Sequence, residues 1–305
     1  MKNAIVFGAT GYIGLALVKK LLSENISVLA IGRKGDKEFF EKINFNSDKI
    51  KYLQINQPLE IFLNDSLKYE NFKQDCILYH FAWSGLDRLT NGDIRDQIKN
   101  LYTTSEILFF AHKFGCTKFI NVSSQEEAIF ENYLKSDKWK NEKYTSSPLY
   151  YAGSKFANAQ LVKLLSYLKK IDYINTRFSI VLDESLDGVS FVASTFKKLQ
   201  NYEGIPEVKN TQPCEIVLLD ELVDAYYKIG LYGKHKADYY LGQGSPNTLM
   251  NYFLNFKSII NSEDKLKQDS FSEDILDIFN PKSLELDTGF IFNKTYKSLA
   301  KEAKQ

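Results

Sequence analysis

The alternation of short apolar runs with helical patterns through the first half of the chain constrains its fold more than any other feature. Two segments, 12–22 and 94–114, place apolar residues at the spacing of an amphipathic helix. A third helix is expected at about 151–169, before a further strand at 173–180. The earlier strands are expected at 4–7, 27–31, 50–55, 76–81 and 118–122. Strands that alternate with helices in this way predict a parallel sheet wrapped by helices.

A glycine turn joins the first expected strand to the first expected helix, with the sequence VFGATGYIG at 6–14. Gly8 permits a tight turn, Gly11 lets the backbone approach a pyrophosphate at the helix N-terminus, and Gly14 allows close packing of helix on strand. A glycine-rich turn without a ligand is the alternative, but the strand before and the helix after are the context that a dinucleotide site requires. The expected cofactor-binding residues in this turn are Gly8, Thr10, Gly11, Tyr12, Ile13 and Gly14.

The choice between NAD and NADP is usually decided at the end of the second strand, where an acidic residue would bind the adenosine ribose and repel a 2′-phosphate. Gly32 occupies that position, and Arg33 follows it with a planar cation suited to phosphate. NADP is therefore favoured over NAD, with NADPH as the expected form. The alternative is that Arg33 and Lys34 only begin a solvated loop.

The pattern loosens after Val181, and we place a smaller domain there. The segments 215–219 and 238–241 predict a return to the sheet, so the smaller domain should be discontinuous. The fold class is α/β: a Rossmann-like doubly wound parallel sheet with a smaller, discontinuous α+β substrate domain. Residues 1–182 plus 214–249 form the expected NADP-binding domain, and residues 183–213 plus 250–305 the expected substrate-binding domain.

Tyr151 and Lys155 form a YxxxK pair, which on a helix places the phenol and the ammonium one turn apart on the same face. A neighbouring cation stabilises a phenolate and moves the tyrosine toward the range useful for proton transfer. The pair alone is weak evidence in a chain with 19 tyrosines. Ser123 and Ser124 strengthen it, because they end a predicted strand at the edge where such sheets bind ligands.

These motifs together resemble the extended short-chain dehydrogenase/reductases, the NAD-dependent epimerase/dehydratase family. The resemblance implies that Tyr151 exchanges the substrate proton, that Lys155 also holds the nicotinamide ribose, and that Ser124, or else Ser123, orients the reacting oxygen. It further implies an active-site role for Asn100 and cofactor contacts from Phe81 and Ala82, which follow His80. Phe178 and Ala128 depart from the family pattern and leave the substrate pocket open to question.

The family dehydratases carry an aspartate acid after the catalytic hydroxyl, whereas this chain has Gln125 between Ser124 and Glu126. An amide does not deliver a proton in that way, so dehydration is disfavoured. The segment 80–83 with 122–125 also resembles nucleotide-sugar 4-ketoreductases. We predict NADPH-dependent reduction of a keto group on a CDP- or dTDP-linked sugar in surface polysaccharide or deoxysugar biosynthesis. The alternatives are a 4-epimerase with tightly bound NAD and, as a different class, a non-catalytic NADP-binding sensor.

Composition limits the partners of the chain. Lys and Arg total 39 against 38 Asp and Glu, so no global charge indicates nucleic acid or an anionic membrane. The three cysteines, Cys76, Cys116 and Cys214, lie far apart and form no metal-ligand pattern. With neither an export signal nor a long apolar run, we expect a soluble, cytoplasmic protein. A homodimer through the helices 94–114 and 151–169 is possible.

Overall fold

The computed structural model describes residues 1–44, 48–55, 69, 71–85, 92–144, 148–187, 190–208, 211–263 and 266–300. Its main sheet has seven parallel strands in the order β10-β6-β5-β4-β1-β2-β3. This confirms the predicted α/β class. The strands are β1 (Asn3–Phe7), β2 (Ser27–Gly32), β3 (Ile50–Gln54), β4 (Cys76–His80), β5 (Lys118–Val122), β6 (Asp172–Arg177) and β10 (Asp238–Tyr240).

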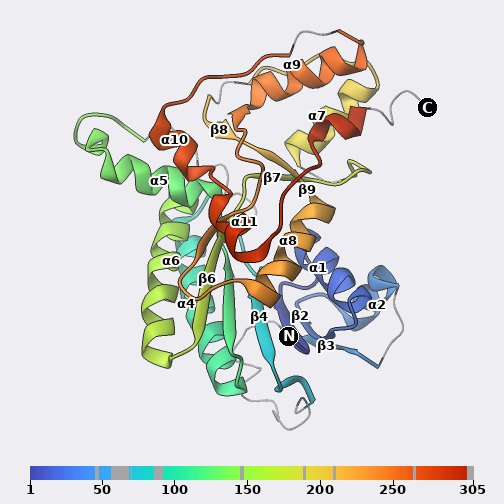
Figure 1. Cartoon of the computed structure of the whole chain (residues 1–305), viewed down its shortest axis with the longest axis vertical. Coiled ribbons are helices and arrows are strands. Elements are labelled where there is room, and N and C mark those ends of the chain that lie inside the picture. Colours follow the sequence, from blue (N-terminus) through green and yellow to red (C-terminus); the bar gives the residue numbers. More distant parts are fainter. Residues whose placement is uncertain are drawn as a thin grey trace.

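Helices cover both faces of this sheet, which explains why its central strands are almost continuously apolar. The helices α1 (Tyr12–Ser23), α2 (Asp36–Ile43) and α8 (Leu219–Tyr232) share one apolar cluster with one face of the sheet. The helices α4 (Ile94–Phe114) and α6 (Leu149–Lys169) pack side by side on the opposite face (Figure 1). The predicted crossover helices therefore occupy the two outer layers of a doubly wound fold.

A smaller lobe stands above the carboxyl ends of the strands (Figure 1). Its core joins α7 (Phe191–Gln200), α9 (Leu249–Ile260) and the short helix η4 (Tyr296–Ala300). Two small sheets belong here: β7 (Ile180–Leu182) beside β9 (Ile216–Leu218), and β8 (Pro213–Cys214) beside β11 (Asn247–Thr248).

The predicted return of 215–219 to the main sheet is wrong, and the packing refines the expected division of the chain. β7 and β9 pair with each other outside the main sheet, and their Leu182, Ile216 and Leu218 belong to the apolar cluster of the smaller lobe. The expected substrate segment 250–305 is also divided. Its helices α10 (Glu273–Ile278) and α11 (Lys282–Thr288) return to the larger lobe, where α10 contacts α5 (Gln125–Lys135) and α11 contacts α8 and β10. The two helices lie near the level at which the two lobes meet (Figure 1).

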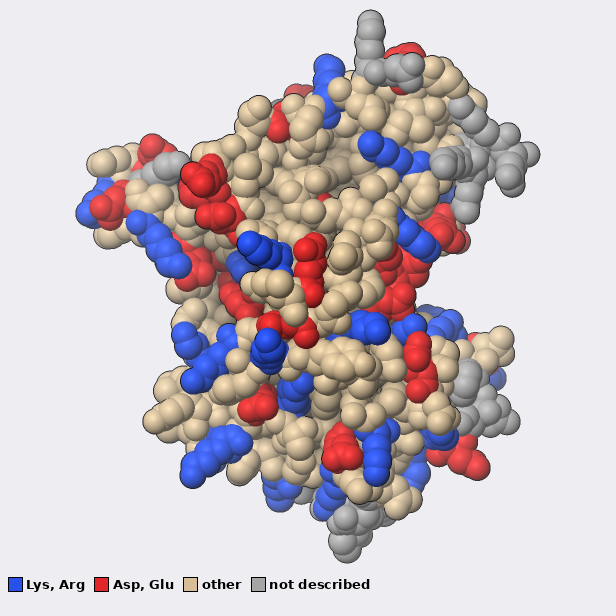
Figure 2. All heavy atoms as spheres, viewed as in Figure 1, with Lys and Arg blue, Asp and Glu red and all other residues tan. Residues whose placement is uncertain are grey.

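Charged side chains of both signs are interspersed over the face shown in Figure 2, without a continuous basic patch. This pattern agrees with the near-zero net charge. Among the described residues, none of the helices combines the length and apolar character that a bilayer span demands. The same residues hold no cluster of His, Cys, Asp and Glu side chains suited to a metal ion.

Candidate active site

The candidate site is a cavity of about 460 Å³ where the larger lobe meets the smaller one. The strand order reverses between β1 and β4, and a parallel sheet of this kind binds ligands at that switch point, beyond the carboxyl ends of its strands. The wall includes residues that follow β1, β4, β5 and β6. From the larger lobe these are Gly8, Gly11, Tyr12, Ile13, Gly14, Phe81, Trp83, Val122, Ser123, Ser124, Gln125, Glu126, Ile129, Tyr151, Lys155 and Phe178.

The glycine turn takes a shape that other residues would not allow. Gly8 has φ +83°, and a Cβ there would lie 2.9 Å from the backbone of Phe81 and of Ala82. A Cβ on Gly14 would lie 2.9 Å from the carbonyl carbon of Gly8. The turn thus packs directly against the segment after β4, and helix α1 begins close to it.

The N-terminus of α1 has the features of an anion-binding site. Its N-cap, Gly11, makes no side-chain hydrogen bond to the helix, and the first turn carries no acidic residue. The first backbone N–H groups of a helix lack internal partners and carry the positive end of the helix dipole. Because this turn lines the cavity, it fits the pyrophosphate of a dinucleotide.

A side chain at Gly32, at the end of β2, would require its neighbours to move. A Cβ on Gly32 would lie 2.9 Å from Thr10 Oγ1 and 3.0 Å from the hydroxyl of Tyr52. Lys34 is engaged with Glu38 at 2.6 Å, whereas the side chain of Arg33 is exposed. Thr10 and Arg33 do not line the 460 Å³ cavity, but they lie at this neighbouring strand end.

Tyr151 and Lys155 both line the cavity from α6. The ammonium of Lys155 donates a hydrogen bond to the carbonyl of Val122 at 2.9 Å and lies 3.7 Å from the ring centroid of Trp83. It lies 5.8 Å from the ring centroid of Tyr151. Trp83 is held in turn by donating its Nε1 hydrogen to Gln97 Oε1 at 2.9 Å. The buried cation is therefore fixed beside the phenol by the end of β5 and an aromatic face.

The two serines after β5 have different partners. Ser124 is the N-cap of α5, and its Oγ accepts a hydrogen bond from the backbone N–H of Glu126 at 3.3 Å. The hydroxyl of Ser123 is hydrogen-bonded to the carboxyl group of Glu127. Burial, and next the nearby Asp238, raise the pKa of Glu127 to about 7. Both serines line the cavity, so either can present a hydroxyl to a ligand.

Asn100 lies outside the cavity wall, 3 % exposed within α4. Its Oδ1 accepts a hydrogen bond from the Ser84 N–H at 2.8 Å, and its Nδ2 donates to the Ser84 carbonyl at 3.0 Å. Asn100 thus fixes the loop that carries Trp83, which suggests a positioning role. Ala82 is likewise absent from the wall, although it packs beneath Gly8, whereas Phe81 lines the cavity.

His80 is a buried residue behind the site. Its Nε2 lies 2.8 Å from the hydroxyl of Thr104, which itself donates to the carbonyl of Asn100 at 2.9 Å. Burial, and next the positive charge of Lys155, lower the pKa of His80 to about 3. The imidazole is therefore neutral and packs within the scaffold.

Part of the cavity wall has no counterpart in the sequence motifs. The residues from the smaller lobe and its connections are Ser179, Ile180, Gln212, Pro213, Cys214 and Leu249. These residues reach the site only because β7, β8 and α9 fold over it, so no local pattern identifies them. Glu126 also lines the cavity, and its position two residues after the serine pair was the available sequence signal.

Gln125 and Tyr12 each bond to a distant segment beside the cavity. Gln125 donates its Nε2 hydrogen to the carbonyl of Ile278 at 3.1 Å and so joins α5 to α10. Tyr12 hydrogen-bonds Asp183, and its burial together with that carboxylate holds the pKa of the phenol well above its usual value. The cavity is therefore bounded on two sides by contacts between distant segments.

The fold resembles that of several solved enzymes. UDP-glucose 4-epimerase from Thermotoga maritima, solved with UDP-glucose, shares 17% identity with a TM-score of 0.69, over 98% of this chain and 96% of that one. UDP-N-acetylglucosamine 4-epimerase from Bacillus cereus shares 14% identity with a TM-score of 0.72, over 99% and 98%. The dTDP-glucose 4,6-dehydratase DesIV from Streptomyces venezuelae, a double mutant with NAD and DAU bound, shares 16% identity with a TM-score of 0.70, over 100% and 96%.

No curated protein matches the chain by sequence. The family model described as the NAD dependent epimerase/dehydratase family does match it, over residues 4–242. This range contains the glycine turn, the serine pair and the tyrosine–lysine pair. The chain therefore belongs to the NAD-dependent epimerase/dehydratase family.

Proposed function

We propose that this enzyme reduces a keto group, at C4, on a CDP- or dTDP-linked sugar with NADPH, in surface polysaccharide or deoxysugar biosynthesis. One observation carries the proposal. Tyr151, Lys155 and the serine pair line the same cavity as the open N-terminus of α1. Groups for proton transfer and for holding a dinucleotide thus meet in one space.

The residues of the chain have distinct tasks in this reaction. Bound NADPH would supply the hydride. Tyr151 gives its phenolic proton to the carbonyl oxygen as that oxygen gains charge, and the Lys155 cation stabilises the phenolate left behind. Ser124 donates a hydrogen bond that polarises and orients the same oxygen. Trp83 and Val122 hold Lys155 in place for this task.

The preference for NADPH is supported by the end of β2. Gly32 carries no carboxylate that would repel a 2′-phosphate, and a side chain there would require Thr10 or Tyr52 to move. Lys34 is paired with Glu38, which leaves Arg33 as the phosphate ligand that we propose.

A 4-epimerase with tightly bound NAD is the second candidate, because solved enzymes that share the fold are epimerases by name. Dehydration is disfavoured by Gln125, whose amide donates to Ile278 and has no acidic proton. The proposed substrate is a sugar nucleotide, and we place the enzyme in the cytoplasm, where sugar nucleotides and NADPH are made.

The proposed quaternary structure is a homodimer. Apolar side chains are exposed along α4 at Ile98 and Tyr102, and along α6 at Leu164, Tyr167 and Leu168. The two helices pack side by side on the larger lobe, and we propose that their exposed apolar side chains together form the dimer surface.

The deciding experiment mixes the purified protein with enzymatically prepared 4-keto-6-deoxy sugars linked to CDP or dTDP and follows NADPH and NADH absorbance. We expect stoichiometric loss of NADPH. Tyr151→Phe should lower kcat by about 10²–10⁴-fold because the proton donor is lost, without changing the melting temperature. Absence of NADPH consumption, with NAD found bound in the purified protein, would instead establish the epimerase.

A further inference from the structure

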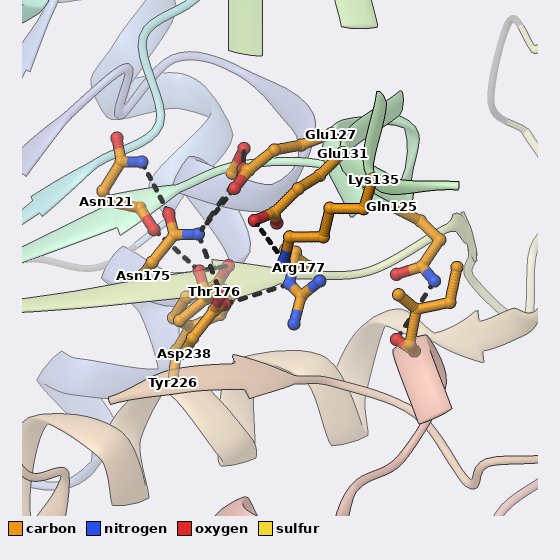
Figure 3. Close-up of polar contacts among 12 residues, drawn as sticks. Asn121, Gln125, Glu127, Glu131, Lys135, Asn175, Thr176, Arg177, Tyr226 and Asp238 are labelled. Atoms are coloured by element: carbon orange, nitrogen blue, oxygen red, sulfur yellow. Dashed lines mark hydrogen bonds and ion pairs between the residues drawn. The ribbon is translucent and has the colours of Figure 1, made fainter. Parts of the chain in front are cut away.

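Asn121, Glu127 and Asn175 belong to a buried polar network (Figure 3), which is bonded to Ser123. The carboxyl group of Glu127, 3 % exposed on α5, is bonded to the Ser123 hydroxyl on one side and to the Asn175 amide on the other. Ser123 lines the cavity, whereas Glu127 does not. Among the described residues, Ser123 is therefore the hydrogen-bonded connection between Glu127 and a ligand in the cavity.

The orientation of Asn175 fixes which oxygen of Glu127 holds a proton. Asn121 donates its Nδ2 hydrogen to Asn175 Oδ1 at 2.8 Å, so Asn175 Nδ2 must face Glu127. Asn175 Nδ2 lies closer to Glu127 Oε1, at 3.2 Å, than to Oε2, at 3.4 Å, and it also donates to Asp238 Oδ1 at 3.3 Å. Oε2 faces the hydroxyl of Ser123. When Glu127 is protonated, its hydrogen therefore belongs on Oε2 and points at Ser123 Oγ.

We propose that Glu127 is a positioning residue whose proton sets the direction of the Ser123 hydrogen bond. With Glu127 ionised, Ser123 donates its hydrogen to Oε2, and its oxygen can only accept from a ligand. With Glu127 protonated, the carboxyl O–H donates to Ser123 Oγ, and the Ser123 hydrogen turns into the cavity. The two states differ by one proton on Glu127, which is exchanged with solvent, and the accompanying turn of the Ser123 hydroxyl changes hydrogen bonds only.

The effect of this hydrogen bond on substrate binding rests on the proposed function. A ketone oxygen accepts hydrogen bonds and donates none, so it is bound best when Ser123 donates. A keto sugar should therefore prefer the enzyme with protonated Glu127 and add a second donor beside Ser124. Its affinity should fall as the pH rises through the neutral range, by about tenfold between pH 6 and pH 8 for one linked proton.

Among the described residues, few charged groups lie near Glu127 on the strands and helices that pack around it. Asp238 on β10 raises its pKa and Arg177 on β6 lowers it, while these two side chains form an ion pair at 3.0 Å. Tyr173 on β6 is neutral near pH 7, because burial, Asp238 and Glu127 raise its pKa to about 12. On α6 the Lys155 ammonium bonds Val122, and on α10 Asp274 accepts a hydrogen bond from Asn132.

The first measurement needs no substrate. In protein labelled with ¹³C at the glutamate carboxyl groups, one signal should titrate near neutral pH, vanish in Glu127→Gln and persist in Glu131→Gln. Glu131 is the matched control, since it lies one turn further along α5 and pairs with Lys135 at 2.8 Å. In Ser123→Ala the midpoint should move to higher pH, because the ionised carboxylate loses an O–H donor. An acidic midpoint, or one that Ser123→Ala leaves unchanged, overturns the proposal.

The second measurement is the pH dependence of Kd for dTDP-4-keto-6-deoxyglucose on wild-type enzyme saturated with NADP⁺, which has no hydride to transfer. The new amide in Glu127→Gln would always donate to Ser123, so this variant should keep the tight affinity of acidic pH up to pH 8. Glu131→Gln should follow the wild type. Retention of the wild-type pH dependence in Glu127→Gln overturns the proposal. Failure of the keto sugar to bind at any pH counts against the proposed substrate class, while the carboxyl titration still decides the coupling of Ser123 to Glu127.

Discussion

Arg33 and Lys34 show how neighbouring residues of one charge take different roles. Lys34 is held by Glu38 at 2.6 Å, an exposed i,i+4 pair along the start of α2. Arg33 precedes that helix with an exposed guanidinium, next to a strand end where Gly32 lies close to Thr10 and Tyr52 and carries no acidic group. The two cations thus differ in what they can offer a phosphate.

Arg33→Ala is expected to raise the KM for NADPH by about tenfold or more, because it removes a charge-assisted hydrogen bond worth roughly 1.5–3 kcal/mol. The KM for NADH should stay unchanged, since NADH has no 2′-phosphate. Lys34→Ala is the matched control and should have little effect on either cofactor. Equal losses for NADPH and NADH in Arg33→Ala would contradict the assigned role.

Helix α5 is the element on which the site depends most closely. Ser124 caps it, Gln125 connects it to α10, and Glu127 extends from it into the polar network behind β5 and β6 (Figure 3). A helix that carries a buried carboxylate with a pKa of about 7 stores a pH-dependent contribution to stability.

The sign of this contribution follows from the raised pKa of Glu127. The folded protein keeps a proton that an unfolded glutamate, with a pKa of about 4.3, has already released. Stability is therefore present at acidic pH and lost as the pH rises through about 7. Glu127→Gln should be more stable than the wild type at pH 8, by on the order of 1–3 kcal/mol, and similar to it near pH 5. Thermal unfolding at both pH values measures this, and Glu131→Gln should show no such difference.

A second prediction at the scale of an element concerns the glycine turn between β1 and α1. Gly8→Ala would place a Cβ 2.9 Å from backbone atoms of Phe81 and Ala82 at φ +83°. We expect lower stability, by about 1–3 kcal/mol, and loss of dinucleotide binding. Gly35→Ala is the control, because a Cβ there meets nothing within 4 Å. Cofactor fluorescence and thermal unfolding check both variants; normal binding by Gly8→Ala would refute the assigned role of the turn.

At the scale of the whole molecule, two lobes enclose the site, and α10 and α11 pack on the larger lobe after the chain leaves the smaller one (Figure 1). The apolar surface on α4 and α6 lies on the larger lobe, away from the cavity wall. Association through that surface would leave the site accessible from the side of the smaller lobe.

Leu168→Glu is expected to shift the protein from dimer to monomer in light scattering after size exclusion, because it places a charge on the proposed interface. Leu168 is 60% exposed, so the folded monomer should tolerate the change. Leu286→Glu is the control, since Leu286 is 74% exposed on α11, outside that surface. A wild-type protein that is monomeric at micromolar concentration would exclude the interface.

The sequence by itself determined the elements whose physics is local. Short apolar runs predict the strands of the sheet, and the GxxGxxG pattern predicts the turn for the cofactor. The YxxxK spacing predicts the position of Tyr151 and Lys155. Each of these patterns depends on residues only a few positions apart. The family match over residues 4–242 agrees with that interpretation.

Only the tertiary structure decided which distant side chains meet. The packing of separate strands and helices brings residues of the smaller lobe to the cavity wall and divides 250–305 between the two lobes. It also forms the hydrogen bonds from Ser123 to Glu127 and from Glu127 to Asn175. Asn100 likewise bonds Ser84 behind the site, although its helix position matches the family pattern. Such contacts arise from burial and hydrogen-bond satisfaction across the whole fold, for which a local sequence pattern carries no signal.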